Sequence, residues 1–158
     1  MQVSAHKKPK ERQLCEWSDA YSIGIPEIDE QHMELVRIMN SLWDALVQRA
    51  GREKTITLIE ALEQYCVAHF GAEETMMRIT GYPELDRHKR SHTKFVGEID
   101  AKKAEVVAGG ELPLDLLHYL RDWLVDHILA ADKHYADYYR EKNRPRSFFQ
   151  RFFGKFVK

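Results

Sequence analysis

Apolar residues recur with a helical period in four successive stretches of this 158-residue chain. Such a period places the apolar side chains on one face of an α-helix. Breaks that contain glycine or proline separate the stretches. The pattern predicts helices over residues 29–50, 53–79, 84–108 and 113–139, the first capped by Asp29 and the last opened by Pro113.

Four long helices joined by short loops predict an all-α, up-down-up-down four-helix bundle. Residues 14–27 hold apolar side chains without a helical period, so we expect them to form an N-terminal arm on the bundle. The chain accordingly divides into a basic N-terminal tail (1–13), the bundle with its arm (14–139) and a basic, amphipathic helical tail (140–158).

Charge is distributed unevenly along the chain. The net charge is −1 at pH 7, but residues 140–158 hold seven Lys or Arg against one Glu, and residues 1–13 hold four against one. The body between these ends is therefore strongly acidic. An acidic body repels phosphates, which argues against a nucleic-acid groove in it.

Composition favours a soluble protein of a reducing compartment. Charged residues make up 31% of the chain and hydrophobic ones 44%. No apolar run approaches the ~20 residues of a membrane span, and the basic N-terminus lacks the apolar stretch of a signal peptide. Cys15 and Cys66 form no motif. We therefore expect a cytoplasmic protein.

Five histidines and two carboxylates fall on the predicted inner faces of the four helices. His69 and Glu73 are four residues apart, as are His88 and His92, so each pair points the same way. Burying this many ionisable groups without a partner would be costly. A metal centre is the simplest explanation, with these candidate ligands: His32, His69, Glu73, His88, His92, His127 and Asp132.

His127 and Asp132 are five residues apart, which is about 140° round an ideal α-helix. They cannot both face inward on a regular helix. Either a local π-type bulge re-aims one of them, or Asp132 reaches round from the edge of the inner face. The sequence leaves both alternatives open.

These residues make the chain similar to the hemerythrin family, in particular its bacterial single-domain members. The similarity extends from Trp17 to Tyr135, about three quarters of the chain. All seven candidate ligands match the residue types of the family. The matching segments are Trp17-Ser18-Asp19, Gly24-Ile25-Pro26-Glu27-Ile28-Asp29-Glu30-Gln31-His32, His69-Phe70, Glu73-Glu74 with Met77, Tyr82-Pro83 with His88 and His92, and Trp123 with His127-Ile128 and Asp132.

The resemblance implies two non-haem iron ions bridged by Glu73, Asp132 and a solvent-derived oxo or hydroxo group. One iron would have three histidine ligands and the other two, which leaves the second iron with a vacant position where the family binds dioxygen. The two histidine sets implied are His88, His92 and His127 for the closed iron, and His32 and His69 for the open one.

The resemblance also implies an apolar wall around the vacancy, because a dry pocket favours the release of oxygen over side reactions. The residues that follow or precede the ligands in the family pattern are Leu35, Phe70, Trp123 and Leu124. All four are equally expected as ordinary core residues.

Other polar residues are expected to lie outside the centre. Glu74 falls one residue off the inner face, so its replacement by Ala should leave the centre in place. His6 and His134 are expected to be solvated, and His118 to lie at the boundary of the core. Cys66 is expected to be a buried, apolar filler.

The leading interpretation is a non-enzymatic oxygen carrier that stores or delivers dioxygen. The alternative is an oxygen or redox sensor, in which the states of the centre would differ in how the C-terminal tail docks. A di-iron oxidase is disfavoured, because the predicted helices lack the Glu-x-x-His pairs of ferritin-like oxidases. Dioxygen and nitric oxide remain open as ligands.

Residues 148–158 separate into an apolar and a basic half on a helical wheel. The apolar half holds five phenylalanines, whose burial needs a surface. A segment this short, with an internal glycine, cannot hold a helix alone in water. We expect it to dock on the acidic body or a second subunit, or on an anionic membrane surface, with plain disorder as the third alternative.

Overall fold

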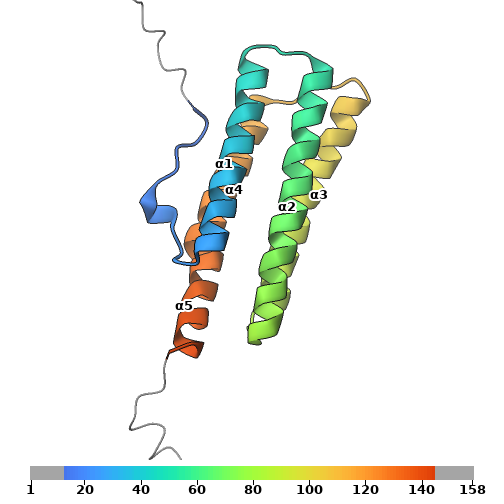
Figure 1. The fold of residues 1–158 in the computed structure, drawn as a ribbon. Helices are drawn as coiled ribbons and strands as arrows, with labels where there is room; N and C mark the ends of the chain where they lie inside the picture. Colours follow the sequence, from blue (N-terminus) through green and yellow to red (C-terminus); the bar gives the residue numbers. More distant parts are fainter. Residues whose placement is uncertain (1–12, 145–158) are drawn as a thin grey trace, which may run out of the picture.

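The computed structural model describes residues 13–144, which form a bundle of long helices (Figure 1). A π-helical turn joins the last two helices without a break, and no strand occurs among these residues. The predicted all-α four-helix bundle is confirmed. The elements are η1 (Asp19–Tyr21), α1 (Pro26–Val47), α2 (Arg52–Thr80), α3 (Leu85–Val107), α4 (Leu114–His127), η2 (Ile128–Asp132) and α5 (Lys133–Lys142).

Successive helices run in opposite directions along the bundle (Figure 1). Helix α2 packs against α1 and α3, and α4 packs against α1. The α1–α2 turn and the α3–α4 loop therefore lie at one end, and the α2–α3 turn and α5 lie at the other. The chain follows the predicted up-down-up-down path.

Apolar side chains at helical spacing form the core. Leu35, Met39 and Leu42 of α1 are each 1% exposed, and they face Leu117 and Leu120 of α4 in the same buried cluster. Full burial of such a side chain stabilises a protein by about 1.5–3 kcal/mol. Packing therefore holds these helices together more than intrinsic propensity does. None of the described helices is long and apolar enough to cross a membrane.

Asp29 does not cap the first helix, so that prediction is wrong. Helix α1 begins at Pro26, with Ile25 in the capping position. The Asp29 carboxylate instead accepts hydrogen bonds from the backbone N–H of Ile23 (2.8 Å) and Gly24 (3.2 Å), and from a serine hydroxyl just before them. Proline suits the first turn of a helix because it needs no N–H donor there. Asp29 thus fastens the arm to α1.

The break predicted at the end of the second helix is present and depends on Gly81. This residue has φ +68°, in the left-handed region that favours glycine. The N–H of Tyr82 donates to the carbonyl of Met77 (2.9 Å), and the N–H of Gly81 donates to that of Arg78 (3.2 Å). This is the Schellman arrangement, which satisfies the last carbonyls of α2 and turns the chain into α3.

The fourth predicted helix continues past Tyr139 and ends in contact with two other segments. Arg140 donates to the carbonyl of Ile23 (2.7 Å), in the arm, and Lys142 donates to the carbonyl of Thr80, at the end of α2. The basic start of the predicted tail therefore belongs to α5. Residues 1–12 and 145–158, with most of both predicted tails and His6, lie outside the described residues, and the division into three parts stays a prediction.

Replacing Asp29 by Ala should lower the free energy of unfolding by about 1–2 kcal/mol, because three donors lose a charged acceptor. Urea unfolding measures the change. The neighbouring, exposed Glu30 is a matched control, and Glu30→Ala should alter stability by less than about 0.5 kcal/mol. Equal effects of the two substitutions would contradict the anchoring role of Asp29.

Candidate metal centre

The seven side chains singled out in the sequence converge inside the bundle, near the end that holds the α2–α3 turn. Each of the seven is at most 7% exposed. All four antiparallel segments contribute. Helix α1 supplies His32, α2 supplies His69 and Glu73, α3 supplies His88 and His92, α4 supplies His127, and η2 supplies Asp132.

The side chains form two groups that share a carboxylate. His32, His69 and Glu73 make up the smaller group, and within each group the potential ligand atoms lie within 4.8 Å of one another. The larger group consists of Glu73, His88, His92, His127 and Asp132. Asp132 also reaches the smaller group, because its Oδ2 lies 3.2 Å from Nε2 of His32. Both carboxylates therefore stand between two sets of imidazoles.

The π-helical turn η2 resolves the spacing of His127 and Asp132. A π-turn joins residue i to residue i+5, which brings two residues five apart onto the same face. The turn spans Ile128–Asp132, and Oδ1 of Asp132 lies 3.1 Å from Nε2 of His127. Of the two alternatives left by the sequence, the local π-bulge is the one present.

Several buried atoms of the centre have no hydrogen-bond partner. They include Nε2 of His32 and of His69, Oε2 of Glu73 and both carboxylate oxygens of Asp132. Nitrogen and oxygen atoms approach to 3.1–3.7 Å here without the alignment of hydrogen bonds. Unpaired buried polar atoms are costly unless a ligand satisfies them. Lone pairs of imidazole and carboxylate groups gathered in this way fit a bound metal cation.

The two carboxylates remain ionised although they are buried. Burial opposes ionisation, but the neighbouring imidazoles, that of His69 above all, hold the pKa of Glu73 well below its usual range, and the pKa of Asp132 is lowered in the same way. Burial also opposes the charged form of His32 and His88, yet the two carboxylates raise the pKa of each to about 9. Burial dominates at His69, where the pKa falls to about 4.

Two residues outside the predicted set orient the proposed ligands. Oε1 of Gln31 lies 2.8 Å from Nδ1 of His69, and Oε1 of Glu74 lies 3.1 Å from Nδ1 of His92. Such partners fix the ring orientation of a metal-binding histidine and leave its other nitrogen for the metal. The sequence places Glu74 one residue off the inner face and assigns it no contact with the centre. The structure adds its contact with His92, for which adjacency to Glu73 is the only sequence signal.

Aromatic rings cover the three-histidine group. Phe70 stacks on His92 with ring centroids 3.8 Å apart, and Trp123 stacks on His127 at 4.5 Å. Phe95 in turn stacks on Trp123 at 3.9 Å. The predicted wall residues Leu35, Phe70 and Leu124 are at most 3% exposed, whereas Trp123 is half-buried. The centre is therefore enclosed by apolar surface on this side.

The remaining residues weighed in the sequence lie away from the centre. His118 packs edge-on against Trp43 at 5.1 Å, in keeping with a boundary position. His134 is exposed as expected, and its Nδ1 is hydrogen-bonded to the hydroxyl of Tyr82 (2.8 Å). Cys66 is fully buried, and burial raises its pKa to about 12, so its thiol is unreactive.

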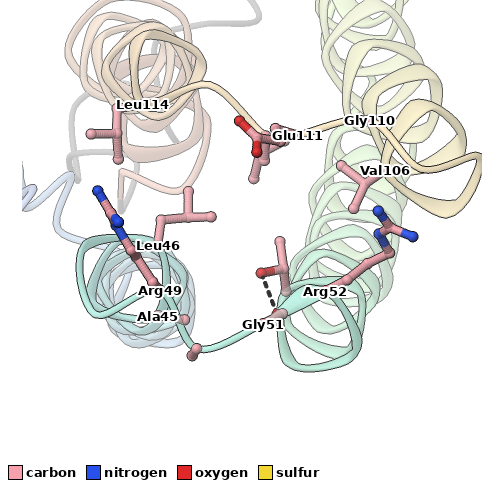
Figure 2. Close-up of a pocket in the computed structure, with 12 residues that line it drawn as sticks. Ala45, Leu46, Arg49, Gly51, Arg52, Val106, Gly110, Glu111 and Leu114 are labelled. Atoms are coloured by element: carbon pink, nitrogen blue, oxygen red, sulfur yellow. Dashed lines mark hydrogen bonds between the residues drawn. The ribbon is translucent and has the colours of Figure 1, made fainter.

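A cavity of about 590 Å³ lies at the opposite end of the bundle (Figure 2). It opens between the α1–α2 turn and the α3–α4 loop, where Leu46, Val106 and Leu114 surround it. Arg49, in the α1–α2 turn, points toward Leu114 at one side of it, and Arg52 donates to the carbonyl of Gly109 (3.1 Å). None of the seven clustered residues lines this cavity.

An antiparallel four-helix bundle with a buried histidine and carboxylate cluster defines a metal-binding helical protein. The family model "Hemerythrin HHE cation binding domain" matches residues 23–139. The chain belongs to the hemerythrin family.

Relatives and solved structures agree with this assignment. Bacteriohemerythrin of Stenotrophomonas maltophilia is 34% identical over 126 residues, which cover 78% of this chain and 80% of the relative. Bacteriohemerythrin of Methylococcus capsulatus is 34% identical over 125 residues, or 78% and 95% of the two chains. A crystal structure of wild-type hemerythrin superposes with a TM-score of 0.75 at 33% identity, over 78% of this chain and 96% of that one.

Replacing Glu74 by Ala should weaken metal binding by about 10–100-fold while the number of bound ions stays the same, because His92 loses its orienting partner. Gln31→Leu should weaken metal binding in the same way, because His69 loses its orienting partner. Competition with a chelator measures both. Glu60, exposed on α2, is the control, and Glu60→Ala should leave affinity unchanged. Wild-type affinity in both test variants would contradict the role of these partners.

Metal binding should release protons below about pH 9. The pKa values of His32 and His88 are raised to about 9, so both imidazoles are protonated at pH 7 and must lose a proton to bind metal. Affinity should therefore rise with pH up to about 9. Protonation of His32 and His88 also adds to the free energy of unfolding of the metal-free protein. This contribution is fully present below the ordinary histidine pKa of 6.5 and is lost as pH rises through about 9.

Anaerobic calorimetry with Fe²⁺, in two buffers of different ionisation enthalpy, counts the released protons. Affinity that stays constant between pH 6 and 9 would contradict the raised pKa values.

Proposed function

We propose that this chain binds two iron ions in the buried centre and uses them to bind dioxygen reversibly, as a carrier or store. The observation that carries the proposal is the pair of ligand groups that share Glu73. One ion alone does not account for seven ligands. When bound, the ferrous pair would supply the two electrons for reversible dioxygen binding at the coordination position left open beside the smaller group.

The proposed ligand sets follow the two groups. His88, His92 and His127 would hold one iron, and His32 and His69 the other. Glu73 and Asp132, with a solvent-derived oxo or hydroxo group, would bridge them. The first iron would thus be held by three imidazoles and the second by two. The second would therefore keep room for a gas ligand.

Leu35, Phe70, Trp123 and Leu124 are proposed to wall that free position. Leu35 and Leu124 are almost fully buried, and Phe70 lies against His69, with ring centroids 5.3 Å apart. Apolar walls exclude water and proton donors, so a bound gas would leave unchanged. The centre is also rich in imidazoles, unlike the carboxylate-rich centres of ferritin-like proteins. We therefore class the chain as a binding protein and not an enzyme.

Sensing is the second candidate, and the connection between η2 and α5 favours it. Asp132 ends the π-turn and leads directly into α5. Tyr138 of α5 donates to the carbonyl of Gly81 (2.8 Å), and Arg140 contacts the arm. A shift of Asp132 between states of the centre would thus move the segment that precedes the C-terminal tail. Nitric oxide is the alternative ligand for either role.

We further propose a cytoplasmic location and the three-part division inferred from the sequence. The basic, phenylalanine-rich tail is proposed to contact a membrane surface, a partner protein or a second subunit. Co-sedimentation with anionic liposomes, with and without residues 145–158, separates the membrane from the protein alternatives. Oxygen binding should survive the truncation.

Metal analysis of protein produced with adequate iron should return two iron ions per chain. Glu73→Ala and Asp132→Ala should each lower this number to one or none, because both groups contact the two histidine sets. Optical spectra of the aerobic and the dithionite-reduced protein test oxygen binding. One iron in the wild-type chain, or identical spectra in the two states, would refute the proposal.

Leu124→Ala should speed oxidation to the inactive diferric form, by roughly tenfold if the lost side chain lowers the barrier by about 1.4 kcal/mol. Its removal would open the proposed apolar wall to water. Leu42→Ala is the matched control, since Leu42 is equally buried but lies ten residues along α1 from His32. Decay of the oxygenated spectrum measures the rate. Equal rates in the two variants would show that the wall has been misplaced.

A further inference from the structure

Another cavity, of about 500 Å³, is lined in part by a residue of the metal centre. It lies between α3 on one side and η2 with the start of α5 on the other. One of its lining residues, His88, is a proposed iron ligand and is 4% exposed. The full lining is Tyr82, Glu84, Arg87, His88, Ser91, Ala130, Ala131 and His134.

Small side chains keep this cavity open. Ser91 lines it from α3, and Ala130 and Ala131 line it from η2. The two alanines directly precede Asp132. The turn that directs the Asp132 carboxylate inward therefore also places small side chains along the cavity. A larger residue at any of these positions would fill space between the surface and His88.

The outer end of the cavity carries donors that suit a divalent cation. His134 is exposed, and its Nδ1 is paired with the hydroxyl of Tyr82 at 2.8 Å, so a cation would bind at its other nitrogen, Nε2. Metal-binding histidines usually have their second ring nitrogen hydrogen-bonded in this way. Glu84 adds a carboxylate, whose charge is balanced by Arg87 at 3.2 Å. These side chains do not themselves form a compact cluster of ligands like the two in the centre.

Aromatic rings cover two members of the three-histidine group. Phe70 covers His92, and Trp123 covers His127, in stacked contact. A hydrated cation loses solvation in crossing such a surface, which is costly. The cavities at the far end of the bundle and beside the arm hold none of the seven clustered residues.

We propose that this cavity is the passage through which metal ions reach and leave the centre. His134, supported by Tyr82, is the first ligand at the mouth, and His88 receives the ion inside. The inference rests on the proposed di-iron function, but it concerns the rate of loading and not the final occupancy.

The test compares the rates at which full-length, metal-free variants take up Fe²⁺ under anaerobic conditions, together with the rate of iron loss to a chelator. Ala130→Leu and Ser91→Leu narrow the passage from opposite walls, and each should slow both rates at least fivefold. Ala50→Leu is the matched control, because Ala50 is exposed and lines the cavity at the far end. It should load at the wild-type rate, and all variants should reach the same final iron content.

His134→Gln should slow uptake at low Fe²⁺ concentration, whereas a high concentration should restore the rate. Wild-type rates in both wall variants would overturn the passage, as would equal slowing by Ala50→Leu. A wild-type rate in His134→Gln at every concentration would overturn the role of His134.

These outcomes differ from a failure of the proposed function. That failure would appear as one iron or none at saturation, or as no oxygenated spectrum, in the wild-type chain. Co²⁺ uptake by the same variants would then still decide whether the passage exists.

Discussion

The carboxylates of Glu73 and Asp132 are each 1% exposed and lie between five imidazoles. All four antiparallel segments of the bundle contribute a side chain to this cluster. Buried carboxylates are costly unless cations or donors surround them. Here the imidazoles hold both pKa values low, and two of those imidazoles have their own pKa raised to about 9. A divalent metal replaces such protons and satisfies lone pairs that otherwise have no partner.

The π-turn η2 is the backbone feature that makes this contact possible. A regular helix would carry Asp132 away from the face of His127, whereas the turn brings the two groups to 3.1 Å. The same turn presents Ala130 and Ala131 to a cavity beside His88 and passes directly into α5. One local irregularity thus sets the position of Asp132, lines this cavity and leads into the C-terminal segment.

The polar and the apolar neighbours of the candidate ligands have different effects. Gln31 and Glu74 hold the outer nitrogens of His69 and His92, so the ring planes are set before any ion arrives. Phe70 and Trp123 stack on His92 and His127 and keep water from that side. The proposed reversible binding of a gas would need both, because fixed ligands limit rearrangement and a dry wall limits proton transfer.

The sequence by itself determined the four-helix architecture, since apolar period and glycine or proline breaks act locally along the chain. It also indicated four of the seven candidate ligands, because His-x-x-x-Glu and His-x-x-x-His pairs share a helix face wherever the helix lies. The other three followed from their places on the predicted inner faces and from the resemblance to the hemerythrin family. The predicted capping role of Asp29 is wrong, because its carboxylate accepts hydrogen bonds from donors in the arm and not from the first turn of α1.

Tertiary structure decided what depends on distances between segments. Gln31 and Glu74 acquire their role only when α1 meets α2 and α2 meets α3, and neither pairing leaves a periodic signal in the chain. The sequence also left open whether a π-turn or a position at the edge of the inner face brings Asp132 to the centre. The folded structure shows the π-turn. Hydrophobic periodicity predicts which face of its helix a side chain occupies. Metal coordination and access to the centre depend instead on which side chains the neighbouring helix places at the same level of the bundle.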